Sequence, residues 1–216
     1  MKRYIVILMI GLANCVLYCM RLNLNIAITE MVRKENTTEI TNYNSNSSEV
    51  DQRSSIPTFE WDELRQQRIL GAFYYGYAVM PIPGGWLARK KGGKRVMVFA
   101  VLWTSLLTAL IPWAAGVSSG LLIVLRILDG LGQGSLLPAS YVIFGKWTVP
   151  DERSSMISIS FSGMTLGVII SSYVSGWISS AYEFGGWPMS FYIYICFGLE
   201  LCPCSLIGAL LVFCVN

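Results

Sequence analysis

Six long apolar stretches run along the chain, and shorter polar segments separate them. A helix needs about 20 predominantly apolar residues to cross the hydrocarbon core of a bilayer. Each stretch reaches about that length, so the pattern predicts six transmembrane helices and an all-α membrane protein. The predicted spans cover residues 4–29, 69–88, 96–115, 121–144, 157–182 and 189–215.

These spans and the loops between them divide the chain into five segments. Residues 1–29 hold a short start and the first span, and residues 30–68 form a long polar loop. The other segments are residues 69–115 and 116–182, with two spans each, and residues 183–216, with the sixth span and an atypical C-terminal end. Glu200 lies in that end, and the pattern assigns it no role.

The composition is typical of a membrane protein and makes several kinds of functional site improbable. Hydrophobic residues make up 54% of the chain and charged residues 13%, against roughly 25% charged in soluble proteins. A net charge of +3 gives little basis for nucleic-acid binding. The chain has no histidine, the commonest metal ligand and general base, and its six cysteines all lie in apolar stretches. We therefore expect no metal site, no cofactor, no disulfide framework and no enzyme activity.

The distribution of lysine and arginine predicts the orientation in the membrane. Five basic residues lie within residues 89–95, and Lys146 and Arg153 lie between the fourth and fifth spans. The short links on the other side, residues 116–120 and 183–188, contain no basic residue. Because basic residues concentrate on the cytoplasmic side, both termini are predicted to be cytoplasmic.

The long polar loop, residues 30–68, is then predicted to be extracellular or lumenal. It carries five basic and eight acidic residues, so the loop as a whole is not basic. Asn36 and Asn46 begin two glycosylation sequons, and both fall in this loop. Residues 42–55 are rich in Asn and Ser and offer little to bury. The sequence therefore predicts a glycosylated outer loop.

A charged residue interrupts the first span. Arg21 lies in its outer half, where a charge is costly and tends to serve a function. No acidic residue accompanies Arg21 within that span, so Arg21 requires a partner on another helix, a water-filled cavity or a bound anion. At helical spacing it belongs to a polar stripe formed by Asn14, Tyr18, Arg21 and Asn25.

The fourth span carries a second set of polar residues on one helical face. Arg126, Asp129 and Gln133 are spaced three and four residues apart. One interpretation is that Arg126 and Asp129 pair only to neutralise each other. The other is that Arg126 and Arg21 face one cavity and hold an anionic substrate, because guanidinium groups bind anions well.

Small residues and prolines predict the local geometry of the helices. Pro81 and Pro83 should kink or unwind the cytoplasmic end of the second span. Small residues at every fourth position let two helix backbones approach closely. Such spacing occurs at Gly163, Gly167, Ser171 and Ser175 in the fifth span and at Gly130 and Gly134 in the fourth.

Several longer motifs resemble one known family. They are residues 59–63, 69–77, 82–88 and 92–96 around the second span, 21–28 in the first, 126–134 in the fourth and 147–154 on the cytoplasmic side. Together they resemble the anion-transporter family that includes sialin, the vesicular glutamate transporters and the type I sodium-dependent phosphate cotransporters. The resemblance runs from about Tyr4 to Gly198, and it is greatest to the invertebrate members described as inorganic phosphate cotransporters.

The resemblance implies a major facilitator fold, in which a small anionic substrate binds between two six-helix halves. Each half contains two inverted three-helix repeats, which relate the first span to the fourth. The substrate-binding arginines of the family correspond to Arg21 and Arg126. The other residues expected to line the cavity are Tyr18, Asn25, Tyr74, Tyr77 and Gln133, and Asp129 is the candidate for ion pairing or coupling.

Two departures from the family pattern affect the expected mechanism. Proton-coupled members have a glutamate where this chain has Gln133, and an amide does not exchange a proton as a carboxylate does. Transport driven by sodium or by membrane potential is therefore favoured, with Na⁺ as the candidate coupling ion. Arg89 stands where the loop motif of the superfamily has an aspartate, so the gating ion pair of that motif is expected to differ.

Three hypotheses about function follow. The first is a secondary active transporter of inorganic phosphate or an organic anion, here as the N-terminal six-helix half that requires a C-terminal half. The second is a truncated, non-transporting product that pairs with or modulates a full-length paralogue. A membrane-embedded serine hydrolase is disfavoured, because no histidine or suitably placed lysine could act as base. The family favours the plasma membrane, although relatives also occupy lysosomal and vesicular membranes.

Overall fold

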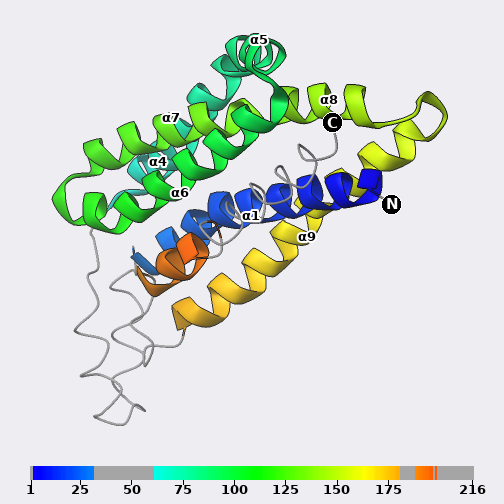
Figure 1. Ribbon diagram of the computed structural model, residues 1–216. Coiled ribbons are helices and arrows are strands. Elements are labelled where there is room, and N and C mark those ends of the chain that lie inside the picture. The colour runs from blue at the N-terminus through cyan, green and yellow to red at the C-terminus, as the bar shows by residue number, and fades with distance from the viewer. Residues whose placement is uncertain (1, 32–60, 181–187, 197, 199–216) are drawn as a thin grey trace.

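The computed structural model describes residues 2–31, 61–180, 188–196 and 198, and within these ranges the chain is helical and contains no strand. Figure 1 shows the long helices lying roughly alongside one another. The helices are α1 (Lys2–Met31), α4 (Glu63–Val79), α5 (Pro81–Lys91), α6 (Gly93–Val117), α7 (Ser119–Gly134), α8 (Leu136–Trp147) and α9 (Arg153–Ser180), with a 3₁₀ turn at Pro150–Glu152 and helical turns at 188–196.

Four segments of the described chain are long and apolar enough to cross a membrane. They are Tyr4–Thr29, Gly93–Val117, Ser119–Trp147 and Pro150–Ile178, and they coincide with the predicted first, third, fourth and fifth spans. The predicted second span is helical but divided into two shorter helices. Of the predicted sixth span, residues 189–196 and 198 are helical, and the rest, with Glu200, lies outside the described residues.

The second and fourth spans are both interrupted, and the interruptions lie against each other. The second span breaks at Met80, directly before Pro81, where the kink was predicted. The fourth span breaks at Ser135 between α7 and α8. A Cβ atom added to Gly84 would lie 2.9 Å from the Cα atom of Ser135, and one added to Gly134 would lie 2.9 Å from the Cβ atom of Met80. The two breaks therefore meet at one level of the bundle.

Glycines bring α4 and α7 into backbone contact. A Cβ atom at Gly76 would overlap the carbonyl oxygen of Ile127, and one at Gly130 would overlap the carbonyl oxygen of Phe73. Neither overlap could be relieved by a side-chain rotation, because the obstructing atoms belong to the backbone. The small residues predicted to let helices approach closely therefore do so here.

A second backbone contact joins α1 to α9. A Cβ atom at Gly163 would overlap the carbonyl oxygen of Gly11, and one at Gly167 would overlap that of Cys15. In Figure 1, α9 runs along α1, while α4 and α6 flank α7. The inverted repeats relate the first span to the fourth and the fifth to the second, so the two glycine contacts are equivalent under that symmetry.

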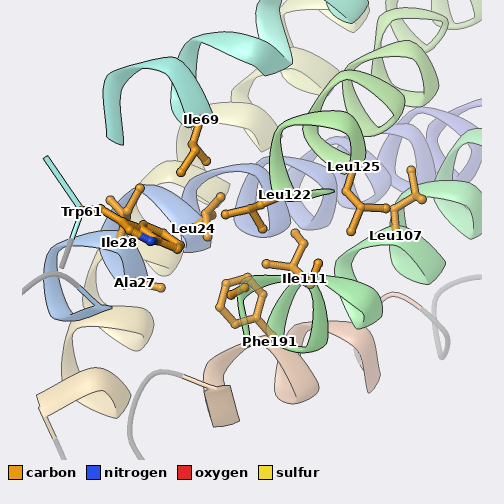
Figure 2. Packing of buried hydrophobic residues seen from close by; sticks show 12 residues of the cluster. Leu24, Ala27, Ile28, Trp61, Ile69, Leu107, Ile111, Leu122, Leu125 and Phe191 are labelled. Atoms are coloured by element: carbon orange, nitrogen blue, oxygen red, sulfur yellow. The ribbon is translucent and has the colours of Figure 1, made fainter. Parts of the chain in front are cut away.

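Two apolar clusters hold the helices together at the two ends of the bundle. The first cluster joins α1, α4, α6, α7 and the turns at 188–196, and Figure 2 shows Leu24, Leu122, Ile111 and Phe191 within it. The second cluster joins α1, α6, α8 and the start of α9, and includes Leu17, Met97 and Phe144. Along the fourth span the polar residues 126–133 follow Leu125 of the first cluster and precede Leu136 of the second. The polar residues thus occupy the middle of the bundle.

Replacing Gly76 with alanine should destabilise the protein by about 1–3 kcal/mol, because the new methyl group would force α4 away from α7. The measurement is the thermal unfolding midpoint of the purified protein in detergent. Gly71→Ala is the matched control on the same helix, since a Cβ atom at Gly71 meets nothing within 4 Å. Equal midpoints for the two variants would contradict the proposed contact.

Candidate anion-binding site

The polar face predicted for the fourth span is buried on α7. Arg126 and Asp129 are each 2% exposed, and Gln133 is 4% exposed. Gly132 lies among them without a side chain, and a Cβ atom there would collide with the ring of Trp103 on α6. The absence of that Cβ atom lets α6 and α7 approach, and the Trp103 Nε1–H donates to the Leu128 carbonyl oxygen at 3.1 Å.

Arg126 and Asp129 form the ion pair expected from their spacing. The Arg126 Nη1 atom lies 3.6 Å from Asp129 Oδ2. The Gln133 side-chain amide donates to both carboxylate oxygens, at 3.3 Å and 3.5 Å. Both neighbours offer hydrogens to the carboxyl group, which is the environment of an ionised carboxylate.

Part of the Arg126 guanidinium has no partner. Its Nε and Nη2 atoms are buried and make no hydrogen bond within the described residues. A buried donor left without an acceptor is costly, more so when it carries charge. These two nitrogens are therefore places where an ordered water or the oxygen of an anion would be stabilised.

Arg21 lies in a different environment, formed by aromatic rings. Its guanidinium carbon is 4.4 Å from the ring centre of Phe73, 5.0 Å from Tyr77, 5.1 Å from Tyr74 and 5.5 Å from Tyr18. The electron-rich faces of such rings stabilise a cation partly removed from water. No carboxylate among the described residues pairs with Arg21, so the rings hold its charge without neutralising it.

A small pocket connects these two groups of residues. Its walls are formed by Leu17, Tyr18, Arg21, Tyr77, Gln133, Leu136, Leu137 and Met164. The space open to the centre of a water molecule is about 10 Å³, which is room for about one water. The pocket must therefore widen before it can admit a phosphate or a carboxylic acid.

The structure brings together most of the residues predicted for the site. Tyr18, Arg21, Tyr77 and Gln133 line one pocket, and Tyr74 reaches the Arg21 guanidinium from α4. Arg126 and Asp129 are not in the pocket wall: Asp129 contacts Gln133 of the wall, and Arg126 pairs with Asp129 behind it.

Two members of the predicted polar stripe on the first span lie elsewhere. Asn25 is exposed and is not part of the pocket wall. Asn14 is buried against α9, where its side-chain amide donates to the Ser160 carbonyl oxygen at 3.4 Å. The stripe therefore faces three different environments, and only its middle part lies in the site.

Sequence reasoning missed Phe73, Trp103 and Met164. Phe73 packs closest to the Arg21 guanidinium, and its position four residues before Tyr77 was the available signal. The predicted glycosylation sites Asn36 and Asn46 lie outside the described residues, so they remain predictions.

An all-helical membrane unit with interrupted helices and a charge pair at mid-depth has the architecture of a secondary transporter. A family model of the Major Facilitator Superfamily matches residues 10–213. The chain therefore belongs to the Major Facilitator Superfamily, and its relatives confirm the resemblance to the sialin and vesicular glutamate transporter family.

These curated relatives are considerably longer than the chain. Human sialin is 37% identical over 194 residues, which cover 85% of this chain and 38% of sialin. Vesicular glutamate transporter 1 of Xenopus laevis is 36% identical over 198 residues, and vesicular glutamate transporter 3 of Danio rerio is 38% identical over 198 residues. Each of these two alignments covers 92% of this chain and 32% of the relative. The chain thus spans about a third of the length of the relatives it matches.

Replacing Asp129 with leucine should destabilise the protein by about 3–5 kcal/mol, because Arg126 would remain buried without its counter-charge. The double variant Arg126→Leu/Asp129→Leu removes both charges and should recover most of that loss. Thermal unfolding midpoints and the yield of monodisperse protein measure both effects. A double variant as unstable as the single one would show that the pair is not the cause.

Proposed function

We propose that this protein carries small anions across a membrane as part of a secondary active transporter. The observation that supports this most is the Arg21 guanidinium, which lines a pocket and has no carboxylate partner among the described residues. Such a group is a ready anion-binding element. The relatives named as vesicular glutamate transporters are named for an anionic amino acid, which agrees with this proposal.

Each residue of the site has a role in this proposal. Arg21 contacts the anion directly, and the hydroxyl groups of Tyr18 and Tyr77 and the amide of Gln133 donate hydrogen bonds to it. Tyr74 is 56% exposed, and its ring packs against the Arg21 guanidinium and helps to hold it in place. Arg126 lies behind the pocket wall, where its unpaired Nε and Nη2 donors would stabilise an oxygen atom of the anion.

Transport also requires a second wall of the cavity. In this fold a substrate binds between two halves, and alternating access arises from one half rocking against the other. The described helices supply one such half. We infer that a second six-helix half completes the site, either from the same polypeptide or from a paralogue.

Two further features of the transport cycle belong to this proposal. An amide at Gln133 holds no exchangeable acidic proton, which favours Na⁺ or membrane potential over a proton as the driving force. The exposed basic residues at the end of α5, Arg89 to Lys91, favour a cytoplasmic position for that end of the bundle. Both termini would then be cytoplasmic, with the plasma membrane as the expected location and inorganic phosphate or an organic anion as the substrate.

Arg21→Ala should reduce anion uptake at least about tenfold at equal surface abundance, because it removes the unpaired cation of the pocket. Arg21→Lys should restore only part of it, since lysine keeps the charge and loses the planar fork of donors. Uptake of labelled phosphate and of glutamate is measured in cells expressing the native transcript. Arg21 is a cleaner test than Arg126, whose removal also leaves Asp129 buried and unpaired.

The matched control for this experiment is Arg65→Ala, since Arg65 is exposed on α4 and lies outside the pocket. It should leave uptake unchanged. Uptake that survives Arg21→Ala at wild-type level would refute the proposed function.

Treatment with an N-glycosidase should increase the electrophoretic mobility of the protein expressed in animal cells, because the loop at residues 30–68 is predicted to face the lumen. The shift should diminish in Asn36→Gln and in Asn46→Gln, and it should vanish in the double variant. A shift that persists in the double variant would place the modified asparagine elsewhere and contradict the assignment.

A further inference from the structure

The bundle contains very few charges at the depth of the membrane. Within residues 4–29, 69–88, 96–115, 121–144 and 157–180, the charged side chains are Arg21, Arg126 and Asp129. Two of them are positive and one is negative, which gives a net charge of +1 for the described part of the membrane interior. An anion that enters the pocket meets these three charges on this wall of the site.

Asp129 neutralises Arg126 in the structure described. The pair is almost fully buried, with side chains 2% and 3% exposed, and its closest atoms are 3.6 Å apart. The Gln133 Nε2 atom donates to both carboxylate oxygens, so Gln133 and Arg126 together hold the carboxylate in place. Arg126 therefore contributes little net positive charge to its surroundings as long as Asp129 is ionised.

The pair is nevertheless coupled to the pocket. Gln133 belongs to the pocket wall and contacts Asp129, so one side chain separates the carboxylate from the bound anion. Arg21 also lines the pocket, and its charge acts on both Arg126 and Asp129. A change in charge at position 129 therefore changes the electrostatic potential in the pocket.

We propose that Asp129 determines the valence of the anion that this protein accepts, by limiting this wall of the site to one net positive charge and so selecting monoanions over dianions. The inference rests on the proposed transport of anions and specifies the class of substrate. Asp129 would act on selectivity through its charge, without contact with the substrate.

The physical reason is the cost of unbalanced charge away from water. Charges interact much more strongly at the low effective dielectric of a protein interior than in water. One additional unit of charge on the anion therefore changes its binding free energy in the pocket. A monoanion balances the net charge that Arg21, Arg126 and Asp129 give to this wall. On this wall a dianion leaves one negative charge without compensation, and desolvating that charge opposes its binding.

The test compares two 2-hydroxy acid anions of different valence, lactate and malate, at pH 7.4. Each is used to inhibit uptake of a labelled substrate by the native protein reconstituted in liposomes. In the wild-type protein lactate should inhibit at lower concentration than malate, by about tenfold or more. Malate that inhibits as well as lactate would overturn the proposal without the need for any variant.

Substitution at position 129 then isolates the effect of charge. Asp129→Asn raises the net charge of the wall to +2 and should shift the ratio of inhibitory concentrations about tenfold towards malate. Asp129→Glu keeps the charge and should keep the wild-type ratio. Charges contributed by a second half are the same in every variant, so the shift reports position 129 alone.

A double variant separates charge from local packing. Arg126→Gln/Asp129→Asn returns the net charge to +1 and should return the ratio to that of the wild type, although both side chains have changed. It also removes the unpaired Arg126 that Asp129→Asn leaves behind, so it should fold at least as well. A ratio that stays shifted in the double variant would show that packing, and not charge, sets the selectivity.

The outcomes distinguish this inference from the proposed function on which it rests. Loss of uptake in Arg21→Ala together with an unshifted ratio in Asp129→Asn would refute the valence mechanism alone. Uptake that is unchanged in Arg21→Ala would refute both the valence mechanism and the proposed function. A shift in Asp129→Asn that reverts in the double variant would support both.

Discussion

Close approach of helix backbones is the constraint on which the rest of this structure depends. Lipid chains are as apolar as leucine, so the hydrophobic effect gives helices little reason to associate within a bilayer. Association relies instead on packing at short range, and glycine is the residue that permits it. Gly76 and Gly130 bring α4 against α7, and Gly163 brings α9 against α1. Bulkier residues at these positions would separate the helices that carry the site.

The same contacts place the aromatic rings around Arg21. Phe73 lies one turn before Gly76, and its carbonyl oxygen is the atom that Gly130 accommodates, so the α4 backbone is fixed against α7 at that turn. The ring of Phe73 then projects over the Arg21 guanidinium, and Tyr77 stacks on Phe73 with 5.7 Å between ring centres. The contact that stabilises the bundle therefore also positions the binding site, and neither can be altered alone.

Sequence reasoning located the charged residues well, because a charge within an apolar stretch is conspicuous. Arg21, Arg126 and Asp129 were each identified, and the spacing on α7 correctly placed Asp129 beside Arg126. Helical periodicity gives the face of a residue but not its depth, which is why Asn25 was grouped with a pocket that it does not line. Phe73 was missed because an apolar ring in an apolar span is indistinguishable from ordinary packing until its neighbour is known.

The adjacent breaks at Met80 and Ser135 have a mechanical consequence. Prolines at positions 81, 83 and 138 have no backbone N–H to donate, so the helical hydrogen-bond ladder is thinned in both spans at this level. Tilting α5 and α8 at these breaks would therefore sacrifice fewer hydrogen bonds than bending continuous helices. Gln133 lies two residues from one break. The two breaks therefore lie next to the small pocket, which would have to widen to admit an anion.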